Sequence, residues 1–271
     1  MADRCYLDTT VLVEALFKTP ARRRRAKAAI GAFSGSSVSV YAIKEMHAGA
    51  MSYLIWLFNK LSETRSLAKT MEAIGAVWMQ RNRMATALEM LAALQSEVVG
   101  AELSDAWNPF QTDRMLADMH MQSLRRIILN GWRDRRRLTT EVVDELKCFP
   151  EESPFYDEEL KMLVMTRRGC PTNRDCSYAP KLRSRPRELE NLLKVIEGST
   201  RAEDNRRRKA LRTLFNTPNR KFEDKQCRDL GDAYFALHCP SDSVILTSNV
   251  KDHQPLAAAL GKSVAEYTWK E

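Results

Sequence analysis

Short apolar runs rich in β-branched residues occur near the two ends of this 271-residue chain, and a long segment of different character separates them. Near the amino end, residues 5–7 and "SVSVY" at 37–41 each resemble a strand, and a helical pattern follows each one. Near the carboxyl end, "SVILTSN" at 243–249 resembles a strand between two helical stretches, and "KSVAEYTW" at 262–269 an edge strand or tail. Alternating strands and helices predict an α/β layer with a parallel sheet, built from both ends of the chain.

The middle of the chain predicts helices. Its apolar residues recur at every third or fourth position, without strand alternation. We therefore expect a discontinuous α/β domain of residues 1–60 plus 221–271 that carries a large, all-helical insertion at 61–220. An extended loop is expected in the second half of the stretch that ends at residue 186. The predicted helices of the insertion lie at 63–99, 113–132, 139–149, 157–165, 187–198 and 203–215.

Basic residues exceed acidic ones and give a formal charge of +8, with clusters at 21–27, 133–137 and 205–212. Clustered cations suit contacts with nucleic-acid phosphates, although solvated helix faces have the same composition. No apolar stretch approaches the length of a membrane span, and the first residues lack the apolar core of an export signal. A cytoplasmic location without a membrane partner is therefore expected.

The six cysteines do not follow a usual zinc-binding pattern. Cys170 and Cys176 are spaced too widely for a zinc knuckle, with Cys148 upstream. Cys5 and Cys239 lie in apolar segments, where a free cysteine is a small core residue. Reduced thiols are the expectation.

Acidic residues fall where the predicted strands end. Asp8 follows the first strand, and Glu45 lies in the first turn of a helix predicted to begin near Ala42. Asp232 begins the helix before the last core strand, and Asn249 and Asp252 follow that strand. The carboxyl ends of parallel strands meet at one edge of a sheet, and Mg²⁺ or Mn²⁺ prefers carboxylate oxygens. These residues therefore predict a metal site suited to phosphodiester hydrolysis.

Each acid also has a purely structural interpretation. Asp8 is able to cap the following helix, and Glu45 is favoured by the helix dipole at the start of its helix. Asp232 competes with Asp229 for a helix N-cap, and Asp252 has the alternative role of starting the last helix. The four histidines, isolated in the sequence, are expected in the core or on the surface.

Three segments resemble the PIN-domain family, the fold of VapC-type toxins and many metal-dependent ribonucleases. "YLDTTVLV" is similar to its first motif, "SVSVYAIKEMHAGA" to its second, and "LGDAYFALHCPSDSVILTSNVKDH" to its third and fourth together. The resemblance covers roughly residues 4–58 and 222–268 and implies a three-layer α/β/α fold. It implies Asp8, Glu45 and Asp232 as metal-site acids, with Asp252 or Asn249 completing the site. The chain departs from the family in its long middle segment and in His253, which stands where an aromatic residue is more usual.

The resemblance further implies an Mg²⁺- or Mn²⁺-dependent endoribonuclease, with a toxin or phage-defence role, and an inhibitor or antitoxin protein as partner. A structured RNA such as tRNA or rRNA is the expected substrate. Two rival hypotheses are an inactive PIN-like scaffold that binds RNA or a protein through the insertion, and a DNA nuclease. The residues expected to contact the nucleic acid are Thr9, Ser248, Arg22, Arg23, Arg24, Arg25, Arg206, Arg207, Arg208 and Lys209.

Overall fold

The computed structural model describes residues 3–76, 88–94, 109–143, 146, 153–165, 177–217, 222 and 224–268. Within these ranges, no helix has both the length and the apolar character that a membrane span requires.

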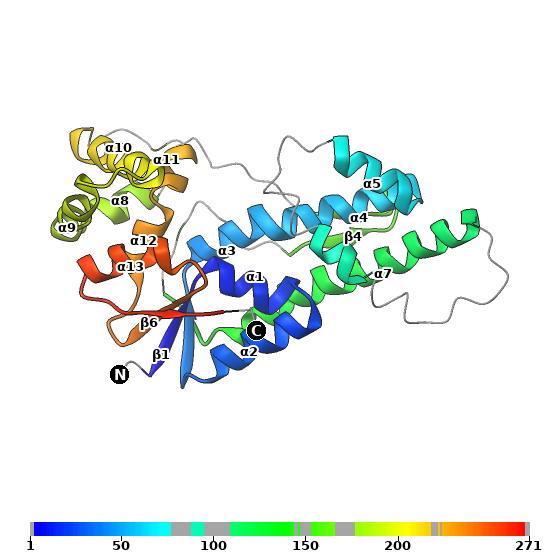
Figure 1. The fold of residues 1–271 in the computed structure, drawn as a ribbon, viewed down its shortest axis with the longest axis horizontal. Helices are drawn as coiled ribbons and strands as arrows, with labels where there is room; N and C mark the ends of the chain where they lie inside the picture. Colours follow the sequence, from blue (N-terminus) through cyan, green and yellow to red (C-terminus); the bar gives the residue numbers. More distant parts are fainter. Residues whose placement is uncertain are drawn as a thin grey trace.

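Five parallel strands form the central sheet, in the order β3-β2-β1-β6-β7 (Figure 1). Their bounds are Arg4–Leu7 (β1), Gly35–Val38 (β2), Glu141–Val142 (β3), Ser243–Thr247 (β6) and Val264–Glu266 (β7). The central strand β1 pairs with β2 on one side and with β6 on the other, and Leu7 lies opposite Leu246. The prediction of a parallel sheet is confirmed, and four of its five strands come from the two ends of the chain.

Helices pack on this sheet in two groups. One group includes α1, which contacts α2, α3 and α7, and the other is the pair α12 and α13. When strands are added on both sides of β1, right-handed crossovers place the two groups of helices on opposite faces of the sheet. The bounds are Thr9–Phe17 (α1), Pro20–Gly31 (α2), Val40–Met46 (α3), Pro109–Leu138 (α7), Gly231–His238 (α12) and Val250–Ala259 (α13).

Two further assemblies extend from the sheet. The first is an arm in which α4 packs against α5, α7 and strand β5 of a β4–β5 hairpin (Figure 1). The second is a helical cluster of α8–α11 in which α9 packs on α13 and α10 packs on α9. The bounds are Ser52–Thr64 (α4), Leu67–Ala76 (α5), Phe155–Asp157 (β4), Met162–Val164 (β5), Tyr178–Arg183 (α8), Pro186–Glu197 (α9), Ala202–Asn216 (α10) and Asp224–Asp229 (α11).

The expectation that residues 61–220 are all-helical is wrong, because they contain three strands. In the predicted helix 139–149, Glu141 and Val142 form β3 and pair with β2, so part of the middle segment completes the main sheet. Thr140 donates its hydroxyl to the carbonyl of Ser36 at 2.7 Å. Its β-branched side chain and that of Val142 favour a strand, and the exposed edge of β2 offers them a partner.

The predicted helix 157–165 is instead the turn and second strand of the hairpin. The Asp157 carboxylate accepts the amide protons of Glu159 and Leu160 at 3.0 and 2.9 Å, which forms a turn in place of a first helical turn. The Asn59 side chain then bonds both backbone groups of Leu163. The loop expected before residue 186 contains helix α8, whereas α5, α7, α9 and α10 confirm predicted helices in part or in full.

Gly231 allows α12 to approach α3 closely. A Cβ atom at this position would lie 2.6 Å from the Tyr41 hydroxyl and 2.7 Å from its ring. Tyr41 is buried and packs against the rings of Tyr178 and Tyr234, so it has no free space in which to move. The contact brings Asp232, the next residue, towards the helix that carries Glu45.

We predict that Gly231→Ala lowers the free energy of unfolding by about 1–3 kcal/mol, because the added methyl overpacks a dense aromatic cluster. Gly31→Ala is the matched control, since a Cβ there meets no atom within 4 Å. Denaturant unfolding measures both variants. Equal stability of Gly231→Ala and Gly31→Ala would contradict the close approach described above.

Candidate acidic site at the carboxyl ends of β1 and β6

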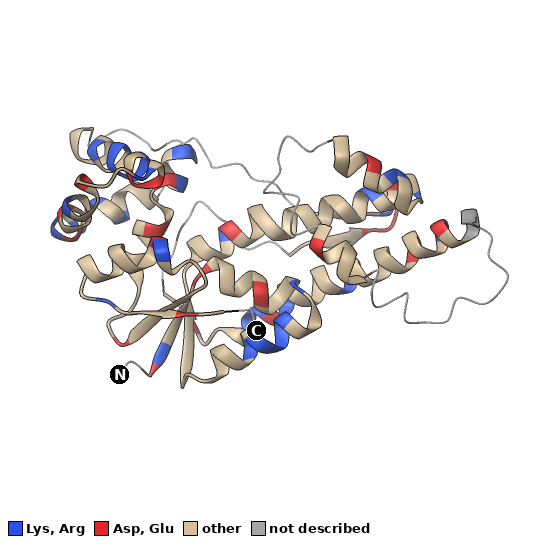
Figure 2. Cartoon of the chain, viewed as in Figure 1, with Lys and Arg blue, Asp and Glu red and all other residues tan. Residues whose placement is uncertain are grey.

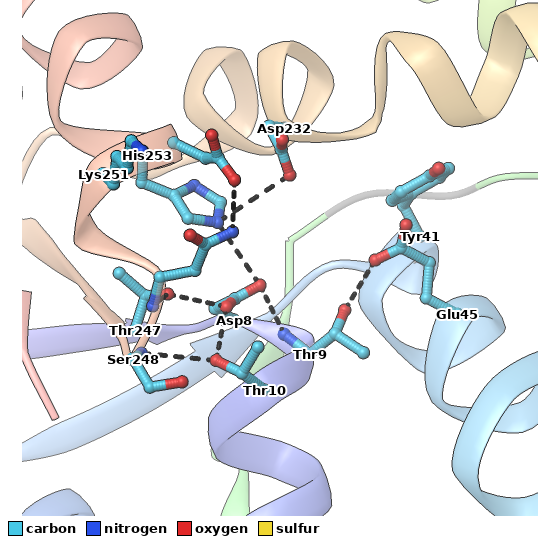
Figure 3. Close-up of polar contacts among 12 residues, drawn as sticks. Asp8, Thr9, Thr10, Tyr41, Glu45, Asp232, Thr247, Ser248, Lys251 and His253 are labelled. Carbon is cyan, nitrogen blue, oxygen red and sulfur yellow. Dashed lines mark hydrogen bonds and ion pairs between the residues drawn. The ribbon is translucent and has the colours of Figure 1, made fainter. Parts of the chain in front are cut away.

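The acids gather at the point where the strand order reverses. From β1 the chain proceeds to β2 and β3 on one side, whereas β6 and β7 lie on the other side. Ligands of open parallel sheets bind beyond the carboxyl ends of the strands at such a switch point. Asp8 follows β1, and Ser248 follows β6 at the same edge (Figure 3). The topology alone therefore predicts a functional site at this edge of the sheet.

Asp8 is held by hydroxyl and amide donors. Its Oδ2 atom accepts the hydroxyls of Thr10 at 2.6 Å and Thr247 at 2.7 Å, and its Oδ1 atom accepts the Thr9 amide at 2.7 Å. It is only 6% exposed and occupies the N-cap of α1, so its structural role is also present. Burial by itself raises the pKa of Asp8, but His253 and the two hydroxyls hold it below its ordinary value.

Glu45 lies in the last turn of α3, and the prediction that it lies in the first turn is wrong. The helix begins at Val40, earlier than predicted, because the Ser39 hydroxyl caps it by accepting the Ala42 amide at 2.9 Å. The segment His47–Met51 follows directly, and the non-helical backbone of Gly49 makes a kink between α3 and α4 there. The Glu45 carboxylate accepts the Thr9 hydroxyl at 2.7 Å.

The pKa of Glu45 lies well above its ordinary value of 4.5. Burial raises its pKa to about 7, the negative charges of Asp232 and Asp8 add to the rise, and the hydroxyls of Thr9 and Tyr41 oppose it. The hydrogen bond from Thr9, the residue after Asp8, holds the Glu45 carboxylate beside the start of α1. A cation at this place would remove the repulsion.

His253 lies between Asp8 and Asp232. Its Nε2 atom is 3.5 Å from Asp8 Oδ1 and 3.9 Å from Asp232 Oδ1 (Figure 3). The side chain is 1% exposed, and its Nδ1 atom has no hydrogen-bond partner among the described residues. Burial lowers the pKa of His253, yet the two carboxylates raise it overall. We expected His253 to be an ordinary core or surface histidine and did not predict this contact. Its position next to Asp252 in the sequence was the one indication of a role in the site.

Asp252 and Asn249 bind each other at the start of α13. The Asn249 side-chain amide donates to Asp252 Oδ2 at 2.7 Å, and Arg201 donates to Oδ1. Burial raises the pKa of Asp252, but Asn249 and Arg201 lower it by more. Both carboxylate oxygens of Asp252 therefore have partners, as do both oxygens of Asp8, and either residue would have to exchange a hydrogen bond to bind a metal.

Arg207, predicted to contact RNA, instead points into the acidic site. Its guanidinium donates to Asp204 at 2.8 Å and to Asp232, and lies 4.0 Å from Asp252. Only 4% of the residue is exposed. Burial lowers the pKa of Arg207, but Asp232 and Asp204 raise it above its ordinary value overall. Sequence reasoning missed this role because it treated the basic residues of the cluster at 205–212 as one surface for nucleic-acid phosphates.

The donor chemistry of the site fits Mg²⁺ or Mn²⁺. The site contains more carboxylates than basic groups, so an added cation would balance its charge. The carboxylates are those of Asp8, Glu45, Asp204, Asp232 and Asp252. The basic groups that bond or pair with them are Arg201, Arg207 and His253. Within the described ranges, however, no three His, Cys, Asp or Glu side chains form a ready-made metal site. Asp8, Glu45 and Asp232 would thus have to close around the ion as it binds, and Asp8 would have to exchange some of its present hydrogen bonds.

The other residues expected to contact nucleic acid divide into two sets. Arg22 is bound to Glu14 and Glu89, whereas Arg24 and Arg25 are exposed on α2, where Figure 2 shows a concentration of basic residues. On α10, Arg206 and Lys209 are exposed, while Arg208 bonds the Glu197 carbonyl and Asn205.

The amino end of α2 is separated from Asp8 by the length of α1, about 14 Å for nine residues. Ser248 is exposed, and its amide donates to the Thr10 hydroxyl at 3.3 Å. Cys5, Cys227 and Cys239 are buried free thiols, and Cys148, Cys170 and Cys176 lie outside the described residues.

No protein-family model, no curated protein and no solved structure matches this chain.

We predict that the pKa of Glu45 gives the metal-free protein a distinctive pH dependence. Between its ordinary value of 4.5 and about 7, the folded state keeps a proton that the unfolded chain has released. The free energy of unfolding therefore falls as pH rises through this window, by at most about 3 kcal/mol. Glu45→Gln removes this slope. Denaturant unfolding of both proteins from pH 4.5 to 7.5 in chelator measures it, and identical slopes would contradict the account.

Proposed function

We propose that this chain is an Mg²⁺- or Mn²⁺-dependent ribonuclease of the PIN type, with an endonucleolytic mode of cleavage. The observation that carries the proposal is the convergence of Asp8, Glu45 and Asp232 at the switch point of a parallel sheet. These acids come from three separate helix-strand units, at the edge where such folds bind ligands. Neither sheet stability nor helix capping requires all three at one place.

In this proposal Asp8, Glu45 and Asp232 hold the metal. The metal would orient and activate water for in-line attack on a phosphodiester and stabilise the leaving oxygen. Thr9 keeps the Glu45 carboxylate directed at the site through its hydroxyl. Thr10 and Thr247 fix the orientation of Asp8. Ser248, which is exposed, would contact the scissile phosphate.

The basic residues supply the sequence-independent part of RNA binding. Arg24 and Arg25 on α2 and Arg206 and Lys209 on α10 are exposed, so they are the phosphate contacts that this proposal retains. The basic groups on α2 are separated from Asp8 by the length of α1, so they would contact phosphates away from the scissile bond, as on a structured RNA. A toxin or phage-defence role with an inhibitor protein, in the cytoplasm, remains part of the proposal.

The runner-up is an inactive scaffold, and one observation favours it. Asp232 and Asp252 already bind Arg207 and Arg201, and Asp8 already has hydroxyl partners. A site satisfied by its own side chains does not require a metal for stability. The two proposals differ in whether Mn²⁺ raises the melting temperature of the wild-type protein, as binding to the folded state must do.

We predict that Asp8→Asn reduces metal-dependent RNA cleavage by at least about 100-fold, since loss of even an outer-shell partner of a metal costs about 10–100-fold. The substitution keeps the shape of the side chain and most of its hydrogen bonds, so the circular dichroism spectrum is expected to stay native. Matched RNA and DNA strands distinguish the polymer. Cleavage that survives both this substitution and chelator would contradict the proposal.

A further inference from the structure

Helix α10 belongs to the part of the chain that the family resemblance does not cover, yet it supplies a side chain to the acidic site. Arg207 is the residue concerned, and Asp232 is the acid that it binds. A buried ion pair gains little stability over packed apolar groups, so stability alone does not explain a buried arginine here. The hydrogen bonds of Arg207 suggest another role.

The Arg207 guanidinium is fixed at both ends. One end donates to Asp204 Oδ1 at 2.8 Å, and Asp204 is itself 5% exposed and accepts the Ser199 hydroxyl on Oδ2 at 2.6 Å. The other end donates to Asp232 Oδ2. A guanidinium held at both ends in this way has little freedom to turn away from Asp232.

The contact leaves the second oxygen of Asp232 directed at the site. Oδ2 is taken by Arg207, whereas Oδ1 faces His253 Nε2 at 3.9 Å, and that nitrogen in turn faces Asp8 Oδ1 at 3.5 Å. Asp232 is about one-third exposed at its side chain, and α12 alone does not bury it. Without Arg207 the carboxylate would be free to rotate towards solvent.

We propose that Arg207 is a positioning residue for the metal site: it holds Asp232 by one oxygen so that the other is presented to the ion, with Asp204 and Ser199 as its anchor. Carboxylates that ligate metals are commonly oriented by such hydrogen-bonded partners. The inference rests on the proposed function, and it gives the α8–α11 cluster a specific task, since this cluster completes the site.

Calorimetric titration of chelator-treated protein with Mn²⁺ alone tests the inference without any measurement of cleavage. We expect Arg207→Gln to weaken Mn²⁺ binding by about 10–100-fold. Arg207→Lys, which keeps the charge but loses the fork, is expected to give an intermediate affinity. Asp204 contacts none of the proposed metal ligands. Asp204→Asn is therefore expected to weaken Mn²⁺ binding by a smaller factor, because it only loosens the hold on Arg207.

Arg206→Gln is the matched control. Arg206 is the neighbouring residue on α10, is exposed, and pairs with Glu203 and Asp229 outside the site. Its Mn²⁺ affinity is expected to equal that of the wild-type protein. Melting in chelator establishes that each variant is folded; if Arg207→Gln fails to fold, Arg207→Lys and Asp204→Asn decide the question.

A role in folding alone would lower the melting temperature and leave the Mn²⁺ dissociation constant unchanged in folded variants. Unchanged affinity in Arg207→Lys and Asp204→Asn would therefore overturn the inference. Tighter binding would also overturn it, because Arg207 would then be a competitor of the metal for Asp232. Wild-type protein that binds no Mn²⁺ would overturn the proposed function and this inference together, whereas wild-type binding with insensitive variants overturns the inference alone.

Discussion

The gathering of carboxylates at the ends of β1 and β6 is the constraint on which the rest of this structure depends. Like charges in a partly buried place repel one another unless cations or hydrogen-bond donors compensate them. The chain uses threonine hydroxyls around Asp8, His253 between Asp8 and Asp232, and arginines on Asp232 and Asp252. Burial raises the pKa of Glu45 to about 7, and the negative charges of Asp232 and Asp8 add to the rise.

This constraint accounts for the arrangement of the elements around the site. The register that places Leu7 opposite Leu246 brings Asp8, the residue after β1, into hydrogen-bond contact with Thr247, the last residue of β6. Gly231 lets α12 approach α3, which brings Asp232 towards Glu45. The long middle segment contributes as well, because α10 inserts Arg207 and the segment at 141–142 completes the sheet.

Sequence patterns predicted the parallel sheet and placed Asp8 directly after β1, because both depend on local signals. An apolar β-branched run followed by a polar residue is visible at β1 and β6 without any knowledge of the fold. Contacts between distant segments were not predictable in the same way. Arg207 looks like any other member of its cluster until the helix is rotated and packed, and β3 became a strand only because β2 offers it an edge.

The family resemblance led to the same acids, and no comparison with known proteins bears on it, so the metal site itself must carry the test. The most direct measurement is a crystal structure of the protein soaked in Mn²⁺, with the ion located by its anomalous scattering. The account predicts one strong peak within about 2.0–2.3 Å of oxygens of Asp8, Glu45 and Asp232, with Arg207 still bound to the other oxygen of Asp232. A map without a peak among these three carboxylates, at Mn²⁺ concentrations that saturate binding in solution, would contradict it.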